Sequence, residues 1–140
     1  NGANFSYVHS AIEKNIGKIA SVVKLSNIEK NKNDEFGQKL AMHIAAINPL
    51  SIDRKDLNKD VIDKEIEIIK AELINSGKKD DMIEKISKGK INKFISDNTL
   101  LNQVWIMDPK KKVSDILKEN KLENDIQILD FIRFKVGEGV

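Results

Sequence analysis

Apolar residues recur at helical spacing through the middle of the chain, between Asn58 and Asn98. A first stripe, with steps of four, three and four residues, consists of Ile62, Ile66, Ile69 and Leu73. A second, less regular stripe consists of Met82, Ile83, Ile86, Ile91, Phe94 and Ile95. Because residues three and four apart share one face of a helix, the stripes predict an antiparallel coiled-coil hairpin. Gly89 stands where a large side chain would be expected, which predicts a close approach of the two backbones.

The residues between the two stripes support this hairpin. Gly77 can adopt the left-handed conformation that ends a helix, and Asp80 and Asp81 follow where the positive end of the next helix dipole favours anions. A hairpin of this size, standing alone, does not bury enough apolar surface to offset its loss of conformational entropy. We therefore expect it to be inserted, as residues 58–98, into a base domain formed by residues 1–57 and 99–140.

Three segments of the base alternate in the way that is typical of strands. Residues 4–10 place Phe5, Tyr7 and His9 on one face, and residues 17–26 are rich in β-branched side chains. These two segments are close enough in sequence to form an antiparallel hairpin. Residues 126–137 predict a half-buried strand, in which apolar and basic side chains alternate: Ile132, Phe134 and Val136 with Arg133 and Lys135.

Helices and a crossing segment complete the base. Asp34 can cap a helix with an alanine-rich face, which Asn48-Pro49 ends, and residues 113–120 predict a short helix. Between the hairpin and the short helix, an apolar run containing Trp105 and Met107 is expected to close the core, and a core role is favoured over an exposed binding anchor for both. The predicted fold class is α+β: a small three-stranded antiparallel sheet packed by helices, with an inserted antiparallel helical hairpin.

Composition narrows the classes of function. The chain of 140 residues can form one domain with a core, and its formal charge of +2 is spread over lysines that alternate with acidic residues, unlike a nucleic-acid-binding stripe. No apolar run is long enough to span a membrane, no leader opens the chain, and the absence of cysteine is typical of a reducing compartment. A cytosolic protein is expected, and a start at Asn1 without Met suggests a piece of a longer one.

Candidate catalytic chemistry is sparse. His43 lies between apolar positions of its predicted helix, which favours a packed, hydrogen-bonded histidine over a ligand. His9 and His43 have no carboxylate at metal-ligand spacing, and Gly137-Glu138-Gly139 lacks the strand-to-helix context of a phosphate-binding loop. No nucleophile has a base beside it. The sequence therefore predicts no enzyme, no catalytic residue, no metal site and no cofactor.

Four blocks in order carry a resemblance to a known family: SYVH at 6–9, AMHIAAINP at 41–49, GKINKF at 89–94 and FIRFKVGEG at 131–139. Together they closely resemble bacterial translation elongation factor Ts, the guanine-nucleotide exchange factor of elongation factor Tu. The likeness runs from Ser6 to Val140. It corresponds to the C-terminal half of the family's core together with its coiled-coil hairpin.

The resemblance implies a domain that binds a protein and breaks no bond. In the family this part binds the third domain of elongation factor Tu, a β-barrel, and the positions that match family contacts here are Tyr7, His9 and Lys39. Direct binding of nucleotide, nucleic acid or membrane is not implied. Without the resemblance, His9 would be interpreted as a satisfied polar residue on a sheet face and Lys39 as a solvated helix lysine.

The chain departs from the family in two ways. The family's N-terminal helical module and the subdomain whose Thr-Asp-Phe-Val loop enters the partner's GTPase domain have no counterpart in these residues. Residues 10–15, SAIEKN, also replace the short glycine-rich turn that often follows the strand histidine, which affects the placement of His9. We therefore expect partner binding without full exchange activity. The alternative is a structural coiled-coil module for self-association or assembly docking.

Overall fold

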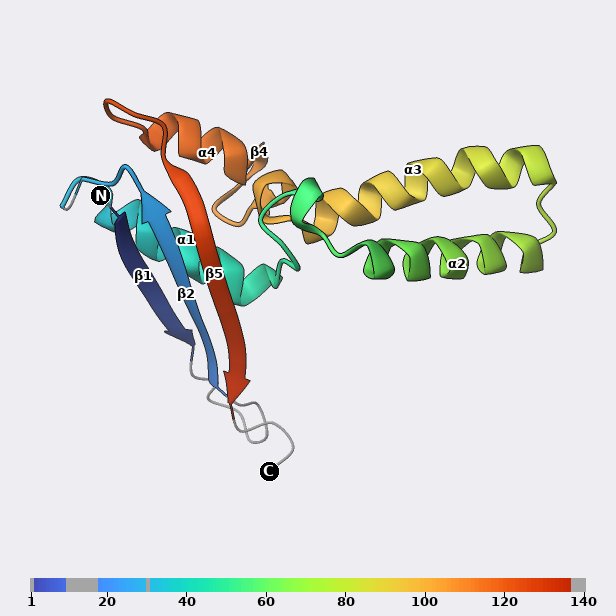
Figure 1. The fold of residues 1–140 in the computed structure, drawn as a ribbon, viewed down its shortest axis with the longest axis horizontal. Coiled ribbons are helices and arrows are strands. Elements are labelled where there is room, and N and C mark those ends of the chain that lie inside the picture. Colours follow the sequence, from blue (N-terminus) through green and yellow to red (C-terminus); the bar gives the residue numbers. More distant parts are fainter. Residues whose placement is uncertain (1, 10–17, 30, 137–140) are drawn as a thin grey trace. The chain divides into compact units, whose positions relative to one another are not determined.

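A computed structural model describes residues 2–9, 18–29 and 31–136 of the chain (Figure 1). The chain divides into two compact units. The sheet unit comprises Asn1–Pro49 and Val104–Val140, and the hairpin unit comprises Leu50–Gln103. The hairpin unit contains the segment predicted as the inserted hairpin together with the residues that flank it.

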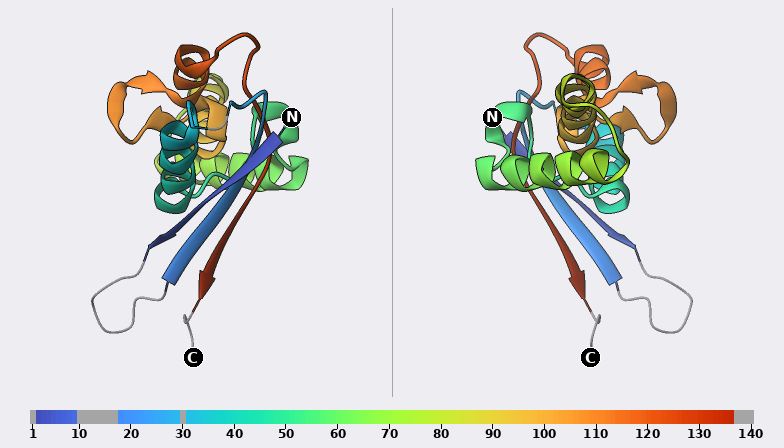
Figure 2. Two further views of the ribbon diagram at one scale, coloured as in Figure 1. Left: turned by 90° about the vertical axis from the view of Figure 1, so that its left-hand side faces the viewer. Right: turned by 90° about the vertical axis from the view of Figure 1, so that its right-hand side faces the viewer.

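The sheet unit is built on three antiparallel strands in the order β1-β2-β5 (Figure 2). These strands are β1 (Gly2–His9), β2 (Lys18–Ser26) and β5 (Gln127–Val136). In the register, Tyr7 lies opposite Ser21, which lies opposite Arg133. The predicted three-stranded sheet is therefore confirmed, whereas the longer turn predicted at residues 10–15 lies outside the described residues.

Helix α1 (Asp34–Ile47) packs on β1 and β2 (Figure 1). Its close approach requires Gly37, because a Cβ at that position would lie 2.4 Å from the Phe5 ring. The predicted cap at Asp34 is wrong: Asn33 holds the N-cap position, and its Oδ1 accepts from the Glu29 amide while its Nδ2 donates to the Asn120 carbonyl. The helix ends as predicted, with Asn48 in the left-handed conformation.

Two short strands that the sequence did not predict follow the hairpin unit. Strands β3 (Val104–Trp105) and β4 (Asp108–Lys112) pair with each other and lead into α4 (Val113–Asn120), which the sequence placed correctly. Trp105 is 4% exposed and its ring lies near those of Phe36 and His43. Its predicted core role is confirmed. Met107 is 45% exposed, so the core role predicted for it is wrong.

The two faces of β5 are used differently from what its residue types suggest. Ile132 and Phe134 are 58% and 47% exposed on the face away from α1. Arg133 points to the other face, where its Nε donates to the Ala45 carbonyl at 3.0 Å. Ala45 lies in the last turn of α1, whose carbonyls have no partner inside the helix. Arg133 therefore satisfies one of the carbonyls at the helix end.

The hairpin unit is rooted by hydrogen bonds between its two ends. The Leu50 amide donates to the Asn98 carbonyl at 2.8 Å, and the Leu100 amide donates to the Ser51 carbonyl at 2.9 Å. Two short 3-10 helices flank this junction, η1 (Arg54–Asp56) and η2 (Leu100–Asn102). The chain that enters the hairpin and the chain that leaves it are thereby held side by side.

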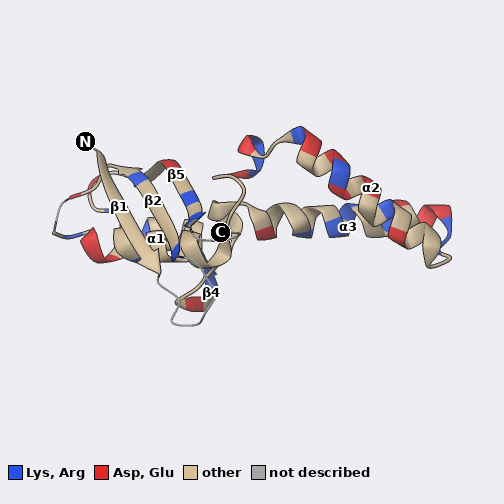
Figure 3. Cartoon of the chain, turned by 90° about the horizontal axis from the view of Figure 1, so that it is seen from below, with Lys and Arg blue, Asp and Glu red and all other residues tan. Residues whose placement is uncertain are grey.

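The hairpin itself consists of α2 (Lys59–Asn75) and α3 (Asp80–Asn98), joined by a turn in which Gly77 has a φ of 78°. Acidic and basic residues alternate along both helices (Figure 3). The seam is buried near the turn, at Ile69, Leu73 and Ile83. The predicted helices and turn are confirmed.

Two details of the predicted seam are wrong. Met82 is 44% exposed and lies outside the buried cluster. A Cβ added at Gly89 would meet nothing within 4 Å, so this glycine does not mark a close approach of the backbones.

Within the residues that the structure describes, no helix is both long enough and apolar enough to cross a bilayer.

Candidate functional site

Tyr7 and His9 form a pair near the end of β1. Both belong to the strand face that also carries the buried Phe5, and the rings stack with centroids 6.3 Å apart and planes inclined by 24°. The Tyr7 hydroxyl lies 3.2 Å from Nδ1 of His9. Tyr7 is half-buried and His9 is exposed. The pair therefore presents an aromatic surface with polar tips to solvent.

A pocket of roughly 270 Å³ opens beside this pair. Three elements of the sheet unit contribute its other walls, with the residues Ile19, Met42, Ala45, Ala46 and Ile106. We call it the Tyr7–His9 pocket. Its walls are mainly apolar, and its polar groups are those of the pair, which is the usual composition of a site that accepts one apolar side chain beside a directional hydrogen bond.

Local sequence explains why the pocket forms. The successive small side chains Ala45 and Ala46 leave space on the flank of α1 that larger residues would fill. The helix is fixed against the sheet by two hydrogen bonds to its carbonyls: Ser21 Oγ donates to Ala41, and Arg133 Nε donates to Ala45. All the pocket walls except Ile106, which lies in the β3–β4 turn, thus belong to strands or to α1, which lowers the ordering cost of binding.

Lys39 lies on the same flank of α1 as Ala46, seven residues earlier, and thus about 10 Å along the helix axis. It lines a separate, more polar cavity of roughly 290 Å³ with Glu35, Phe36 and Trp105 among its walls. Lys39 Nζ lies 2.6 Å from Glu35 Oε1. The hydrogen bond from Lys39, aided by its charge, lowers the pKa of the exposed Glu35 carboxyl below its ordinary value.

The structure therefore brings Tyr7 and His9 together but places Lys39 in a neighbouring cavity. The segment between β3 and β4 connects the two, because Trp105 lines the Lys39 cavity and the next residue, Ile106, lines the Tyr7–His9 pocket. Met107 follows with 45% of its side chain exposed. The candidate surface thus runs along one flank of α1, with the β3–β4 turn beside it.

His43 takes no part in this surface. It is fully buried and stacks on Trp105, with ring centroids 5.3 Å apart and planes inclined by 15°, as expected of a packed histidine. Among residues 2–9, 18–29 and 31–136, no group of three or more acidic or histidine side chains could hold a metal ion. The arrangement offers shape and hydrogen bonding, which suit recognition of a protein surface.

Sequence reasoning missed five residues of the site: Ile19, Met42, Ala45, Ala46 and Ile106. The alanine-rich flank of α1 was a usable signal, because small residues on a helix mark a place where something else approaches closely. Ile106 gave no such signal, since its neighbours in sequence divide between buried Trp105 and exposed Met107. Only the β3–β4 pairing, with its irregular register at Val104–Trp105, directs Ile106 toward the pocket.

Comparison with known proteins gives consistent matches along the whole chain. The family model described as Elongation factor TS matches residues 1–138. An elongation factor Ts of Orientia tsutsugamushi (strain Boryong) is 37% identical over 143 residues, covering 100% of this chain and 46% of that protein. One of Thermoanaerobacter sp. (strain X514) is 39% identical over 144 residues, covering 96% of this chain and 67% of that protein. This chain therefore spans about half the length of relatives such as the Orientia protein.

Proposed function

The chain belongs to the elongation factor Ts family, and from this premise we propose that it is the partner-binding part of a guanine-nucleotide exchange factor for elongation factor Tu in translation elongation. The observation that carries the proposal is the Tyr7–His9 pocket, a preformed apolar recess beside the stacked rings of half-buried Tyr7 and exposed His9. Aromatic side chains next to a desolvated recess are the features that concentrate binding energy at protein interfaces.

The proposed mechanism needs no covalent chemistry. An exchange factor binds the nucleotide-free form of its partner more tightly than the nucleotide-bound form, and linkage requires that it weaken nucleotide binding by the same factor. In this scheme Tyr7, His9 and Lys39 contact the partner, and the Tyr7–His9 pocket accepts an apolar side chain from it. No cofactor is involved, and the chain itself binds no nucleotide.

The proposal assigns partner binding, but not full exchange activity, to these residues. The Thr-Asp-Phe-Val loop that the resemblance associates with the partner's nucleotide site has no counterpart in the sequence. Binding to the partner's barrel alone has little differential affinity for the two nucleotide states, and a ligand without differential affinity shifts no equilibrium. We therefore expect these residues to bind elongation factor Tu while accelerating GDP release only slightly.

Calorimetry with nucleotide-free elongation factor Tu tests the binding, and release of a fluorescent GDP analogue tests the division of roles. Binding should weaken by about tenfold in His9→Ala, in line with loss of an interface anchor. Asn4→Ala is the matched control, because Asn4 is exposed on the opposite face of the same strand. Absence of heat at tens of micromolar protein, or equal losses in both variants, would contradict the proposed site.

A second candidate is a structural module that self-associates through the hairpin. It is favoured by exposed aliphatic side chains on α2 and α3, since Ile68, Ile74 and Met82 are between 43% and 62% exposed. Light scattering distinguishes the two functions. A concentration-dependent dimer that does not respond to elongation factor Tu would support the structural module instead.

A further inference from the structure

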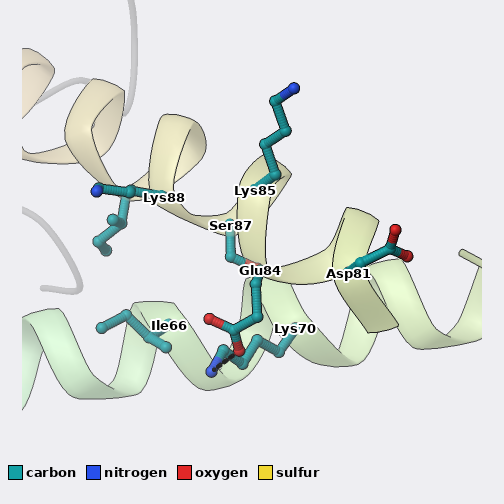
Figure 4. A pocket seen from close by; sticks show the side chains of 8 residues that line it. Ile66, Lys70, Asp81, Glu84, Lys85, Ser87 and Lys88 are labelled. Atoms are coloured by element: carbon teal, nitrogen blue, oxygen red, sulfur yellow. Dashed lines mark hydrogen bonds and ion pairs between the residues drawn. The ribbon is translucent and has the colours of Figure 1, made fainter. Parts of the chain in front are cut away.

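The hairpin unit has a groove between its two helices that plays no part in the proposed binding of elongation factor Tu. It has a volume of roughly 470 Å³ (Figure 4). Ile66 of α2 and Ile91 of α3 give it apolar walls, and Ser87 lies between them on the α3 side. We call this recess the hairpin groove.

The groove exists because the coiled-coil seam closes only near the turn. Ile69, Leu73 and Ile83 are 5–7% exposed, whereas Ile66 and Ile91 are only half-buried. Two helices bury one side of each other, and the aliphatic residues beside a loosely closed seam stay partly in water. A third helix laid along the groove would remove that surface from water, as it does in helical bundles.

Ser87 gives a second and independent reason to expect an occupant. It is 6% exposed, and its Oγ has no hydrogen-bond partner among the residues that the structure describes. A buried hydroxyl without a partner destabilises the state that contains it, so an occupant that brings a polar atom to this position gains from satisfying it. An occupant that brought only apolar side chains would leave the Ser87 hydroxyl without a hydrogen-bond partner.

The charges on the rim indicate the chemistry of that occupant. Lys70 and Glu84 pair with each other across the groove, 3.1 Å apart. Lys85 and Lys88 form no ion pair within the described part of the chain, and their ammonium groups extend away from the Lys70–Glu84 pair (Figure 4). Asp81 also lines the groove, one turn before Lys85, so three lysines face two carboxylates in the lining. The lining keeps a net positive charge, which is complementary to carboxylates.

We propose that the hairpin groove docks an amphipathic helix of a separate protein, with an aliphatic stripe against Ile66 and Ile91 and carboxylates against Lys85 and Lys88. A polar atom of that helix meets Ser87 Oγ. The proposal stands whether or not the chain binds elongation factor Tu, because no groove residue belongs to the Tyr7–His9 pocket.

A second copy of this chain fits the groove less well. Its α2 offers Val61 and Ile68 with Glu65 between them, which is a suitable aliphatic and acidic stripe. By helical spacing that stripe lies on the flank of α2 opposite Ile66, so stripe and groove lie on opposite sides of one hairpin. Copy-to-copy docking would then be head-to-tail, which builds a ring or a filament rather than a two-fold dimer.

Two synthetic helical peptides test the proposal with the full chain. Both carry leucines at helical spacing; one has glutamates beside them and the other has lysines at the same positions. In the methyl and amide NMR spectra, the glutamate peptide should shift Ile66, Ile91 and Ser87 and bind at least about tenfold more tightly than the lysine peptide. Binding of neither peptide at about 1 mM, or equal binding of both, overturns the proposal.

Variants of the chain sharpen the test. Lys85→Glu with Lys88→Glu should reverse the preference for the two peptides. Lys78→Glu with Lys90→Glu makes the same change of charge at exposed positions outside the groove and should preserve the preference. Ser87→Ala should weaken binding without lowering the melting temperature, because the unsatisfied hydroxyl is removed. Shifts confined to Val61 and Ile68, or a dimer that Lys85→Glu with Lys88→Glu abolishes, would assign another occupant and refute the proposal.

Discussion

The Tyr7 hydroxyl lies 3.2 Å from Nδ1 of His9, two residues further along the same strand. When the neutral imidazole accepts this hydrogen bond at Nδ1, its proton resides on Nε2. The exposed edge of His9 is then a donor. The pair thus orients the ring, and the tautomer of His9 sets the kind of hydrogen bond that the ring offers to a partner.

Tyr7→Phe tests this relationship, since it removes the hydroxyl and keeps the ring. Affinity for elongation factor Tu should fall by about threefold to tenfold, in line with the loss of one hydrogen bond that positions a contact residue. Nitrogen chemical shifts of His9 should report a mixture of tautomers in the variant and mainly the Nε2-protonated form in the parent protein. Unchanged tautomer populations would show that the hydroxyl does not position His9.

Gly37 and Gly89 provide a matched pair of glycines in helices. A Cβ at Gly37 would lie 2.4 Å from the Phe5 ring, so Gly37→Ala should destabilise the sheet unit by about 1–3 kcal/mol, as overpacking does. A Cβ at Gly89 meets nothing within 4 Å, so Gly89→Ala should stabilise the hairpin by up to about 1 kcal/mol through helix propensity. Chemical denaturation measures the change in the free energy of unfolding of each variant. Changes of the same sign would contradict the packing described.

Much of this fold could be predicted because its signals are local. The aliphatic stripe of α2 and Gly77 define the hairpin, and Asn48-Pro49 defines the end of α1. The outcome at Gly89 could not be predicted, because a glycine that permits close packing and one that faces open space look alike in sequence. Only the relative rotation of the two helices distinguishes them.

The site was less predictable than the fold because it depends on contacts between distant segments. His9 and Tyr7 were identified through the family resemblance of the SYVH block, but their pocket is completed by Ile106, almost 100 residues later. The inward position of Arg133 was equally hard to predict, because its hydrogen-bond acceptor there is the Ala45 carbonyl, 88 residues earlier in the chain. Neither of these two contacts can be inferred from the residues that are its neighbours in sequence.

The Glu35–Lys39 pair gives a prediction for pH dependence. The pKa of Glu35 is lowered in the folded protein below its ordinary value of 4.5, so the pair contributes stability above that value. The contribution is lost as the pH falls through the lowered pKa. Lys39→Met should raise the pKa of Glu35 toward its ordinary value, as carboxyl NMR titration can measure. The difference in stability between the parent protein and Lys39→Met should disappear at a pH where Glu35 is protonated in both.

Trp105 and Met107 should respond in opposite ways to truncation. Trp105→Ala removes a buried ring that contacts Phe36 and His43, and should destabilise the protein by about 3–5 kcal/mol. Met107→Ala removes an exposed side chain and should change stability by less than about 0.5 kcal/mol. Thermal unfolding of both variants checks this. A large loss in Met107→Ala would mean that the β3–β4 turn is packed rather than exposed.

Phe5 and Phe134 allow the two faces of the sheet to be compared with one chemical change. Phe5 is 9% exposed beneath α1, whereas Phe134 is 47% exposed on the opposite face. Phe5→Ala should therefore destabilise the sheet unit by about 3–5 kcal/mol, and Phe134→Ala by less than about 1 kcal/mol, because only the first leaves a cavity. Urea denaturation followed by the fluorescence of Trp105 measures both. Equal losses would mean that the outer face of the sheet is covered in solution, and that Phe134 belongs to a core which these residues alone do not complete.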